Sequence, residues 1–180
     1  MAACINQVKQ EDTIIVNELG VPPDALDLTQ PGTFIGTSYA GGLGAGLGLS
    51  LGARMGAPEQ NVILVVGDGS YLFGNPLSTH MVANFENLPT LTVLMNNRRW
   101  HAVLRSTLAM YPDGHTAHSK ESIPLVEFAN SPDYVAVMIA CGGYGERVET
   151  PDELLTALKR GMTAVNKGQP ALIEVITATG

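Results

Sequence analysis

The chain has 180 residues, enough for one α/β domain whose core needs no disulfide or metal support. Its 45% hydrophobic and 15% charged residues exclude a disordered chain, and a net charge of -7 argues against a broad contact with nucleic acid or an anionic membrane. The two cysteines lie far apart, and no charged and then apolar leader opens the chain, which favours the reducing cytoplasm.

Four short apolar runs are expected to form strands. They do not alternate with polar residues, which is typical of parallel strands covered on both faces. The runs are residues 13–16, 61–66, 90–95 and 171–176.

Two amphipathic segments between these runs are expected to form helices. In residues 76–85, Leu77, Met81, Val82 and Phe85 recur at helical spacing. Residues 151–158 follow Thr150 with a proline and acidic residues in the first turn, which is typical of a helix start. Strands alternating with helices predict one doubly wound α/β domain, residues 1–180, with a mostly parallel sheet and helices on both faces.

A glycine-rich stretch without charge runs from residue 32 to 53. Seven glycines between residues 36 and 53 argue against a transmembrane span, and the spacing favours a helix with a glycine stripe that lets another backbone approach. The stripe consists of Ala40, Gly44, Gly48, Gly52 and Gly56. Residues 98–122 show no regular pattern apart from a turn at 111–114, which is typical of a lid or specificity loop.

The most informative feature is a pair of polar motifs, each directly after an apolar run. Gly67-Asp68-Gly69-Ser70 follows residues 61–66, and Asn96-Asn97 follows residues 90–95. A βαβ unit would bring both motifs to the same edge of neighbouring strands, which lie ~4.8 Å apart. An acid and an amide there can share one Mg²⁺, and the free N–H groups at the start of the next helix favour a phosphate.

These residues resemble the thiamine diphosphate motif of the acetolactate synthase, pyruvate decarboxylase and benzoylformate decarboxylase superfamily. Gly41-Gly42-Leu43-Gly44 is similar to that superfamily's segment beside the cofactor's aminopyrimidine ring. The resemblance runs from residue 13 to 176 and covers one of the family's three domains, the C-terminal diphosphate-binding domain. It implies the thiamine diphosphate-binding fold, with the N-terminal pyrimidine-binding and central domains absent from this chain.

The resemblance also implies a set of site residues. The Mg²⁺ ligands would be the side chains of Asp68 and Asn97 and the carbonyl of Arg99, although residues 73–76 make the spacing between the two motifs longer than in most relatives. The Gly41 carbonyl would accept the 4'-amino group, Leu43 would bend the cofactor, and Val21, which has no hydroxyl, would contact the diphosphate only through its backbone. The implied cofactor-binding residues are Gly20, Val21, Gly41, Gly42, Leu43, Gly67, Gly69, Ser70, Asn97, Trp100 and Ala102.

The implied activity is acetolactate synthase-like cleavage and formation of carbon–carbon bonds on 2-oxo acids or aldehydes. In this superfamily the carboxylate that activates the cofactor belongs to the pyrimidine-binding domain, usually of a neighbouring subunit. The resemblance therefore implies no catalytic residue in this chain, a partner domain or subunit that completes the site, a homo-oligomer, and no activity of the chain alone.

Two alternatives stay close to this reading. One is a benzoylformate decarboxylase-like decarboxylase, although Val103 stands where some decarboxylases carry a catalytic carboxylate. The other is a cofactor-binding module without activity. Trp100, His101, Arg105 and residues 110–120 lie where relatives shape the substrate pocket.

Three further interpretations have weaker motifs. Residues 36–40 approximate a hydrolase nucleophile elbow around Ser38, but residues 30–33 before it do not have the apolar pattern of the strand that an elbow needs. A dinucleotide-binding domain would need a strict Gly-x-Gly-x-x-Gly, which the sequence lacks. His115 and His118 could bind a transition metal, but no third ligand lies near them in sequence, so a solvated or substrate-facing loop is favoured.

Overall fold

A parallel sheet of six strands forms the centre of the molecule. The structure is a computed structural model, and it describes residues 1–18, 20–36, 40–119, 123, 125–128 and 130–178. The sheet order is β2-β1-β3-β4-β6-β5, and every strand pair is parallel. The strands are β1 (Ile14–Glu18), β2 (Phe34–Ile35), β3 (Val62–Gly67), β4 (Leu91–Asn96), β5 (Tyr144–Val148) and β6 (Ala171–Ile176).

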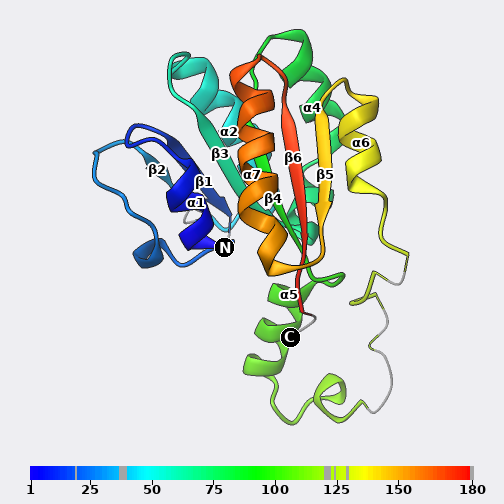
Figure 1. Cartoon of the computed structure of the whole chain (residues 1–180). Coiled ribbons are helices and arrows are strands. Elements are labelled where there is room, and N and C mark those ends of the chain that lie inside the picture. Colours follow the sequence, from blue (N-terminus) through cyan, green and yellow to red (C-terminus); the bar gives the residue numbers. More distant parts are fainter. Residues whose placement is uncertain (19, 37–39, 120–122, 124, 129, 179–180) are drawn as a thin grey trace.

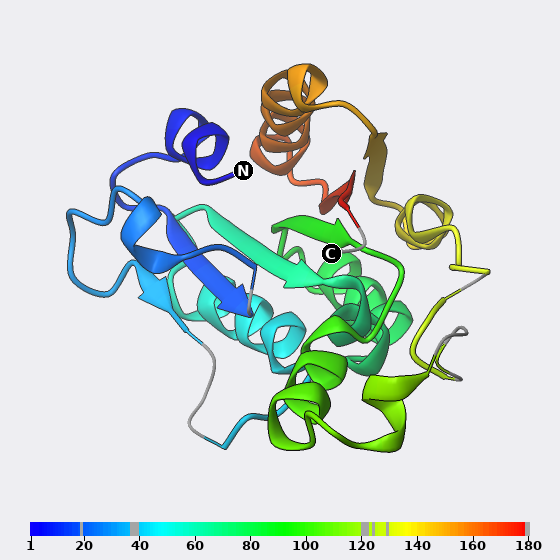
Figure 2. The same ribbon diagram turned by 90° about the horizontal axis from the view of Figure 1, so that it is seen from below.

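Helices cover both faces of this sheet, as Figure 2 shows from the edge where the strands end. Helices α1 and α7 lie on one face, α2, α3, α4 and α6 lie on the other, and α5 lies beyond the carboxyl edge (Figure 1). The α-helices are α1 (Ala2–Val8), α2 (Ala45–Gly56), α3 (Asp68–Phe73), α4 (Pro76–Phe85), α5 (His101–Met110), α6 (Tyr134–Ala140) and α7 (Pro151–Asn166), and the 3-10 helices are η1 (Pro23–Ala25) and η2 (His115–His118).

The apolar strands supply two core layers at once. Ile63 and Val65 of β3 pack in the cluster that includes α7, whereas Val62, Leu64 and Val66 pack in the cluster that includes α2, α3 and α6. Because successive side chains of a strand point to opposite faces, a strand buried on both faces needs an unbroken apolar run. The doubly wound α/β fold predicted from these runs is confirmed.

The sequence pattern missed the less regular elements. Edge strand β5 carries glycine and charged residues, and β2 is two residues long, so neither has an apolar run. Helix α5 lies within residues 98–122, where a regular element was not expected, and this expectation was wrong. The predicted turn at 111–114 is present, with the Gly114 N–H donating to the Tyr111 carbonyl at 3.0 Å.

Of the glycines in the stripe, Gly44 alone approaches another backbone as predicted: its Cβ would lie 2.6 Å from the backbone nitrogen of Gly74. Helix α2 begins after Gly44, and a Cβ at Gly48, Gly52 or Gly56 would meet nothing within 4 Å. Gly46, which lies outside the stripe, also makes a close approach: its Cβ would lie 2.7 Å from Glu18 Oε2 and 2.9 Å from Leu64 Cδ1.

Helix α4 forms where the spacing predicts it, but the face that is buried is not the apolar one. Its buried residues are His80 and Ala83. The four apolar side chains that indicated the helix are 41 to 70% exposed, so their spacing identified the helix without identifying its buried face: Leu77, Met81, Val82 and Phe85.

The buried His80 should make the stability of the fold sensitive to acid. Its ring accepts or donates a hydrogen bond with the Tyr71 hydroxyl at 2.7 Å, and burial lowers its pKa from 6.5 to about 4. As the pH falls, His80 is therefore protonated in the unfolded chain before it is protonated in the folded chain. The contribution of neutral His80 to the unfolding free energy is complete above pH 6.5 and is lost towards pH 4. That lowering corresponds to about 3 kcal/mol of unfolding free energy.

We expect His80→Gln to remove this part of the acid sensitivity. Urea unfolding at pH 7 and pH 4 should show a smaller loss of unfolding free energy in the variant than in the parent chain. An equal loss in both proteins would show that His80 is not the group responsible.

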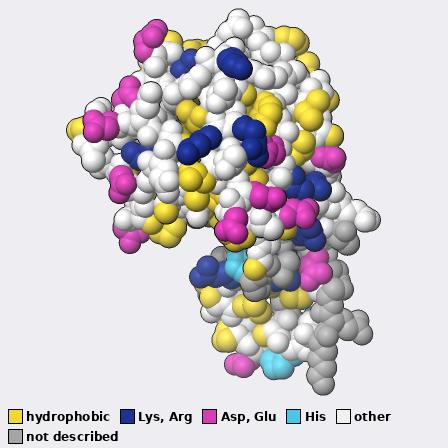
Figure 3. All heavy atoms as spheres, in the orientation of Figure 1, with side chains coloured by type: hydrophobic (Ala, Val, Ile, Leu, Met, Phe, Trp, Pro, Cys, Tyr) yellow, Lys and Arg dark blue, Asp and Glu magenta, His cyan; other side chains and the backbone are white. Residues whose placement is uncertain are grey.

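Side chains of both charges, Lys and Arg as well as Asp and Glu, lie on the face that carries α1 and α7 (Figure 3). Within the described ranges, no helix combines the length and the apolar character that a membrane crossing requires.

Candidate functional site

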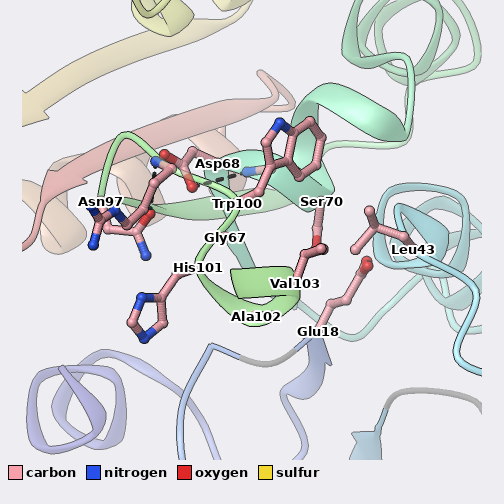
Figure 4. Close-up of a pocket in the computed structure, with 12 residues that line it drawn as sticks. Glu18, Leu43, Gly67, Asp68, Ser70, Asn97, Trp100, His101, Ala102 and Val103 are labelled. Atoms are coloured by element: carbon pink, nitrogen blue, oxygen red, sulfur yellow. Dashed lines mark hydrogen bonds between the residues drawn. The ribbon is translucent and has the colours of Figure 1, made fainter. Parts of the chain in front are cut away.

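A cleft lies at the carboxyl edge of the sheet, where the chain leaves β1 towards β2 on one side and β3 continues to β4 on the other. Such a switch point is where open α/β sheets bind ligands. Figure 4 shows Asp68 and Asn97 on one side of the cleft and Leu43 and Glu18 on the other. The lining residues are Glu18, Leu43, Gly67, Asp68, Gly69, Ser70, Asn97, Arg99, Trp100, His101, Ala102 and Val103.

Asp68 is a buried carboxylate at the end of β3, with 2% of its surface exposed. Its Oδ1 accepts the Gly69 N–H at 2.9 Å and its Oδ2 accepts the Arg98 N–H at 2.7 Å. Burial raises the pKa of this carboxyl despite these hydrogen bonds. No ion pair to Asp68 occurs within the part of the chain that the structure describes, so a bound cation would supply the missing positive charge.

Asn97 follows β4 in a tight turn. Gly67 pairs with Met95 across β3 and β4, so the residues after them leave the sheet side by side. The Asn97 Oδ1 accepts the Arg99 N–H at 3.1 Å, and the Arg99 carbonyl accepts the His101 N–H at 2.8 Å. A carbonyl or carboxamide oxygen has two lone pairs, so one accepted hydrogen bond does not prevent it from binding a cation.

Gly69 and Ser70 lie in the first turn of α3 beneath an aromatic wall. A Cβ at Gly69 would lie 2.6 Å from Cε3 of Trp100, so only glycine lets the indole cover this turn. The indole also packs edge to face against Phe128, with ring centroids 5.0 Å apart. Trp100 is therefore fixed as the apolar wall over the buried Ser70.

Glu18 holds the opposite wall in place, a role that the sequence analysis missed. Its side chain, 3% exposed, accepts the Gly44 N–H at 2.6 Å and the Gly46 N–H at 2.7 Å. The carboxylate thus caps the start of α2 from β1 and fixes Leu43 at the cleft.

We expect Glu18→Gln to destabilise the fold because the carboxamide nitrogen cannot accept one of these two N–H groups. The unfolding free energy in urea should fall by about 1–3 kcal/mol. Glu59→Gln, at an exposed glutamate just beyond α2, is the control and should change it little. Equal effects of the two substitutions would contradict the proposed capping role.

Several residues from the sequence prediction lie elsewhere. Gly20 and Val21 border a different cavity beside Asn17, whose side chain bonds to the N–H groups of both and to the Val21 carbonyl. Gly42 borders a third, small cavity, and Gly41 is exposed with φ +63°.

Of the residues in the weaker motifs, His115 and His118 do not line this cleft. His115 and His118 are exposed. Ser38 and Lys120 lie outside the described residues.

The oxygen atoms at the cleft fit a hard divalent cation. One carboxylate, one carboxamide and one backbone carbonyl are ligands that suit Mg²⁺ when waters or phosphate oxygens complete its shell. Within the described ranges, no group of three or more His, Cys, Asp and Glu side chains could hold a metal, so a zinc-type centre of protein ligands is not found there.

Comparisons with known proteins show the family of the chain. Residues 23–175 match the family described as "Thiamine pyrophosphate enzyme, C-terminal TPP binding domain". The chain is 30% identical over 152 residues to the acetolactate synthase large subunit IlvG of Mycobacterium tuberculosis, covering 84% of this chain and 25% of that protein. It is 30% identical over 160 residues to a 2-hydroxyacyl-CoA lyase of Oryza sativa subsp. japonica, covering 89% of this chain and 26% of that protein.

Among solved structures, the thiamine diphosphate-dependent 4-hydroxybenzoylformate decarboxylase of Rhodococcus jostii RHA1 is similar with a TM-score of 0.81 and 27% identity, covering 99% of this chain and 32% of that one. The chain therefore spans about a quarter to a third of the length of these relatives. The family match covers most of the sequence and includes both polar motifs, and on this basis the chain belongs to the thiamine pyrophosphate enzymes, as their C-terminal cofactor-binding domain.

Proposed function

We propose that this chain supplies the Mg²⁺- and diphosphate-binding half of an active site in an acetolactate synthase-like enzyme that cleaves and forms carbon–carbon bonds in 2-oxo acids. The observation that carries the proposal is the single cleft bordered by Asp68, Ser70 and Asn97 at the ends of neighbouring strands. The relatives named above support the choice of enzyme class.

In this proposal each wall of the cleft has a task. Asp68, Asn97 and the Arg99 carbonyl would hold Mg²⁺, and the first turn of α3 with Gly69 and Ser70 would hold diphosphate oxygens. The aromatic and aliphatic walls would exclude water from the cofactor. When bound, thiamine diphosphate supplies a nucleophilic carbon and accepts electrons as a bond next to a carbonyl breaks.

The chain is proposed to need a partner that carries the pyrimidine-binding domain, in a homo-oligomer or as a separate subunit. The cleft, as bounded by the described residues, has a volume of about 130 Å³. Pockets that enclose a drug-sized ligand usually measure ~300–1,000 Å³, so the cleft is too small to enclose such a ligand alone. Glu18, the second carboxylate at the cleft, already accepts two backbone N–H groups and is committed to α2. The carboxylate that activates the cofactor is therefore assigned to the partner.

The substrate side of the cleft is proposed to be formed by Trp100, His101 and Val103. The buried Nδ1 of His101 has no hydrogen-bond partner among the described residues and could meet an oxygen of the substrate. Val103 has an aliphatic side chain, which favours a synthase or lyase over a decarboxylase that protonates its product from this position. A benzoylformate decarboxylase-like activity is the second candidate, supported by the similarity to the Rhodococcus enzyme.

The proposed compartment is the cytoplasm, which fits the two free thiols Cys4 and Cys141.

Fluorescence of Trp100, the single tryptophan of the chain, tests the proposal directly. Thiamine diphosphate should change it saturably in the presence of Mg²⁺, and EDTA should reverse the change. The chain alone should not turn over pyruvate, whereas addition of a pyrimidine-binding partner should produce acetolactate or release CO₂. Mg²⁺-independent binding would contradict the metal site, and turnover by the homogeneous chain alone would contradict the half-site.

A further inference from the structure

A buried hydrogen-bond network lies behind the cleft and does not line it. Glu174 of β6 is 1% exposed, and its carboxylate accepts the Asn96 Nδ2–H at 2.7 Å and the Arg147 Nε–H at 2.8 Å. These three residues border a separate cavity on the other side of the turn after β4. A carboxylate inside a sheet is costly unless it is paired and hydrogen-bonded, so this arrangement constrains both of its donors.

Asn96 connects this network to the turn. Its Nδ2 donates to Glu174, and its Oδ1 accepts the Arg98 N–H at 3.0 Å. The two partners fix the orientation of the amide, because the carboxylate requires a donor and the N–H requires an acceptor. Asn96 therefore ties the start of the turn to β6, across 78 residues of sequence.

The Arg98 N–H completes the connection to the cleft. It donates both to Asn96 Oδ1 and to Asp68 Oδ2, the latter at 2.7 Å. Arg98 has φ +59°, a left-handed conformation that a non-glycine residue adopts mainly when its surroundings impose it. A continuous series of hydrogen bonds thus runs from Arg147 through Glu174, Asn96 and Arg98 to Asp68.

We propose that Glu174 and Asn96 are positioning residues for the metal site. They hold the turn that carries Asn97 and the Arg99 carbonyl, and through the Arg98 N–H they set the orientation of the Asp68 carboxylate. This inference depends on the proposed Mg²⁺ and diphosphate site. It gives the first asparagine of the Asn96-Asn97 pair a role distinct from that of the second, since Asn96 acts through the backbone of Arg98 and makes no contact with the ion.

Glu174→Gln tests the role of the network. The amide group cannot replace both carboxylate oxygens that accept from Asn96 and Arg147, so the hold of β6 on the turn should weaken. In titrations of Mg²⁺ at fixed thiamine diphosphate, followed by Trp100 fluorescence, the Mg²⁺ concentration at half-saturation should rise about 10–100-fold, the range seen when outer partners of metal ligands are removed. The matched control is Glu146→Gln, which breaks the Arg160 ion pair on neighbouring strand β5 without touching the turn, and should leave this concentration unchanged.

A second variant restores the hydrogen bond between positions 96 and 174 with donor and acceptor exchanged. When Asn96→Asp is combined with Glu174→Gln, the new carboxylate at position 96 can accept from both the Arg98 N–H and the new amide group at position 174. The oxygen of that amide group can in turn accept from Arg147. We expect this double variant to fold and to recover Mg²⁺ binding to within about threefold of the parent chain, a free-energy difference below 1 kcal/mol. Arg147→Gln, at a residue 43% exposed, should fold and should weaken Mg²⁺ binding less than Glu174→Gln.

The outcomes separate this inference from the proposed function. If the parent chain shows no Mg²⁺-dependent response, the proposed function fails. If the parent responds and Glu174→Gln responds at the same Mg²⁺ concentration, only the positioning role fails. The role is also overturned if Glu146→Gln weakens binding equally, or if Glu174→Gln does not fold and the double variant folds but fails to bind Mg²⁺. Urea unfolding of each variant shows whether a binding change accompanies a general loss of stability, which the positioning role does not require.

Discussion

Asp68→Asn is expected to abolish the Mg²⁺-dependent binding of thiamine diphosphate. The substitution removes the one negative charge among the proposed ligands, and a hard cation binds a neutral carboxamide less strongly than a carboxylate. Calorimetric titration in the presence of Mg²⁺ should show affinity reduced by at least about 100-fold, which corresponds to ~2.7 kcal/mol of binding free energy.

The same substitution should have a much smaller effect on the fold. It relieves the burial that raises the pKa of Asp68, but it also loses the acceptor for one of the Gly69 and Arg98 N–H groups. These effects oppose each other, and the unfolding free energy should change by no more than about 1 kcal/mol. Asp152→Asn, at an exposed aspartate on α7, should leave cofactor affinity unchanged. Retention of Mg²⁺-dependent binding by Asp68→Asn would contradict the assigned ligand.

Gly44→Ala is expected to be the most destabilising single substitution in the loop before α2. Gly44 has φ +80°, and an added Cβ would lie 2.6 Å from the backbone nitrogen of Gly74. No side-chain movement can relieve the strain of the left-handed conformation or the clash with the backbone of Gly74. The unfolding free energy should fall by about 3 kcal/mol, and Leu43 should lose its place at the cleft.

Gly48→Ala, inside helix α2, should instead stabilise the fold. Its Cβ would meet nothing within 4 Å, and alanine is favoured over glycine inside a helix. The unfolding free energy should rise by about 0.5–1 kcal/mol. Urea unfolding of both variants checks the pair. Similar effects of the two substitutions would show that Gly44 is not required by its conformation.

The sequence indicated those parts of the fold and site that depend on local patterns. Strands β3 and β4 were predictable because burial on both faces requires apolar runs, and Asp68 and Asn97 were predictable because each directly follows one of these strands. Strand β5 lies at the edge of the sheet and is only partly buried. Its sequence can therefore contain glycine and charged residues, and it gives no such signal.

Long-range contacts account for what could not be predicted. The capping role of Glu18 was missed because its hydrogen-bond partners lie 26 and 28 residues further along the chain. The anchor of Asn96 is more distant still, at Glu174. The burial of His80 and the exposure of Phe85 on α4 likewise depend on which face of that helix meets its neighbours, and spacing alone does not contain this information.

The position of the metal ion is the most direct test of the whole account. Crystals of the chain grown with thiamine diphosphate and Mn²⁺, which gives an anomalous signal, would locate the ion independently of any enzymatic assay. The account predicts an anomalous peak at bonding distance from the Asp68 carboxylate and the Asn97 amide oxygen, with the diphosphate on the same ion. A peak elsewhere, or a bound cofactor whose diphosphate lies away from both side chains, would contradict it.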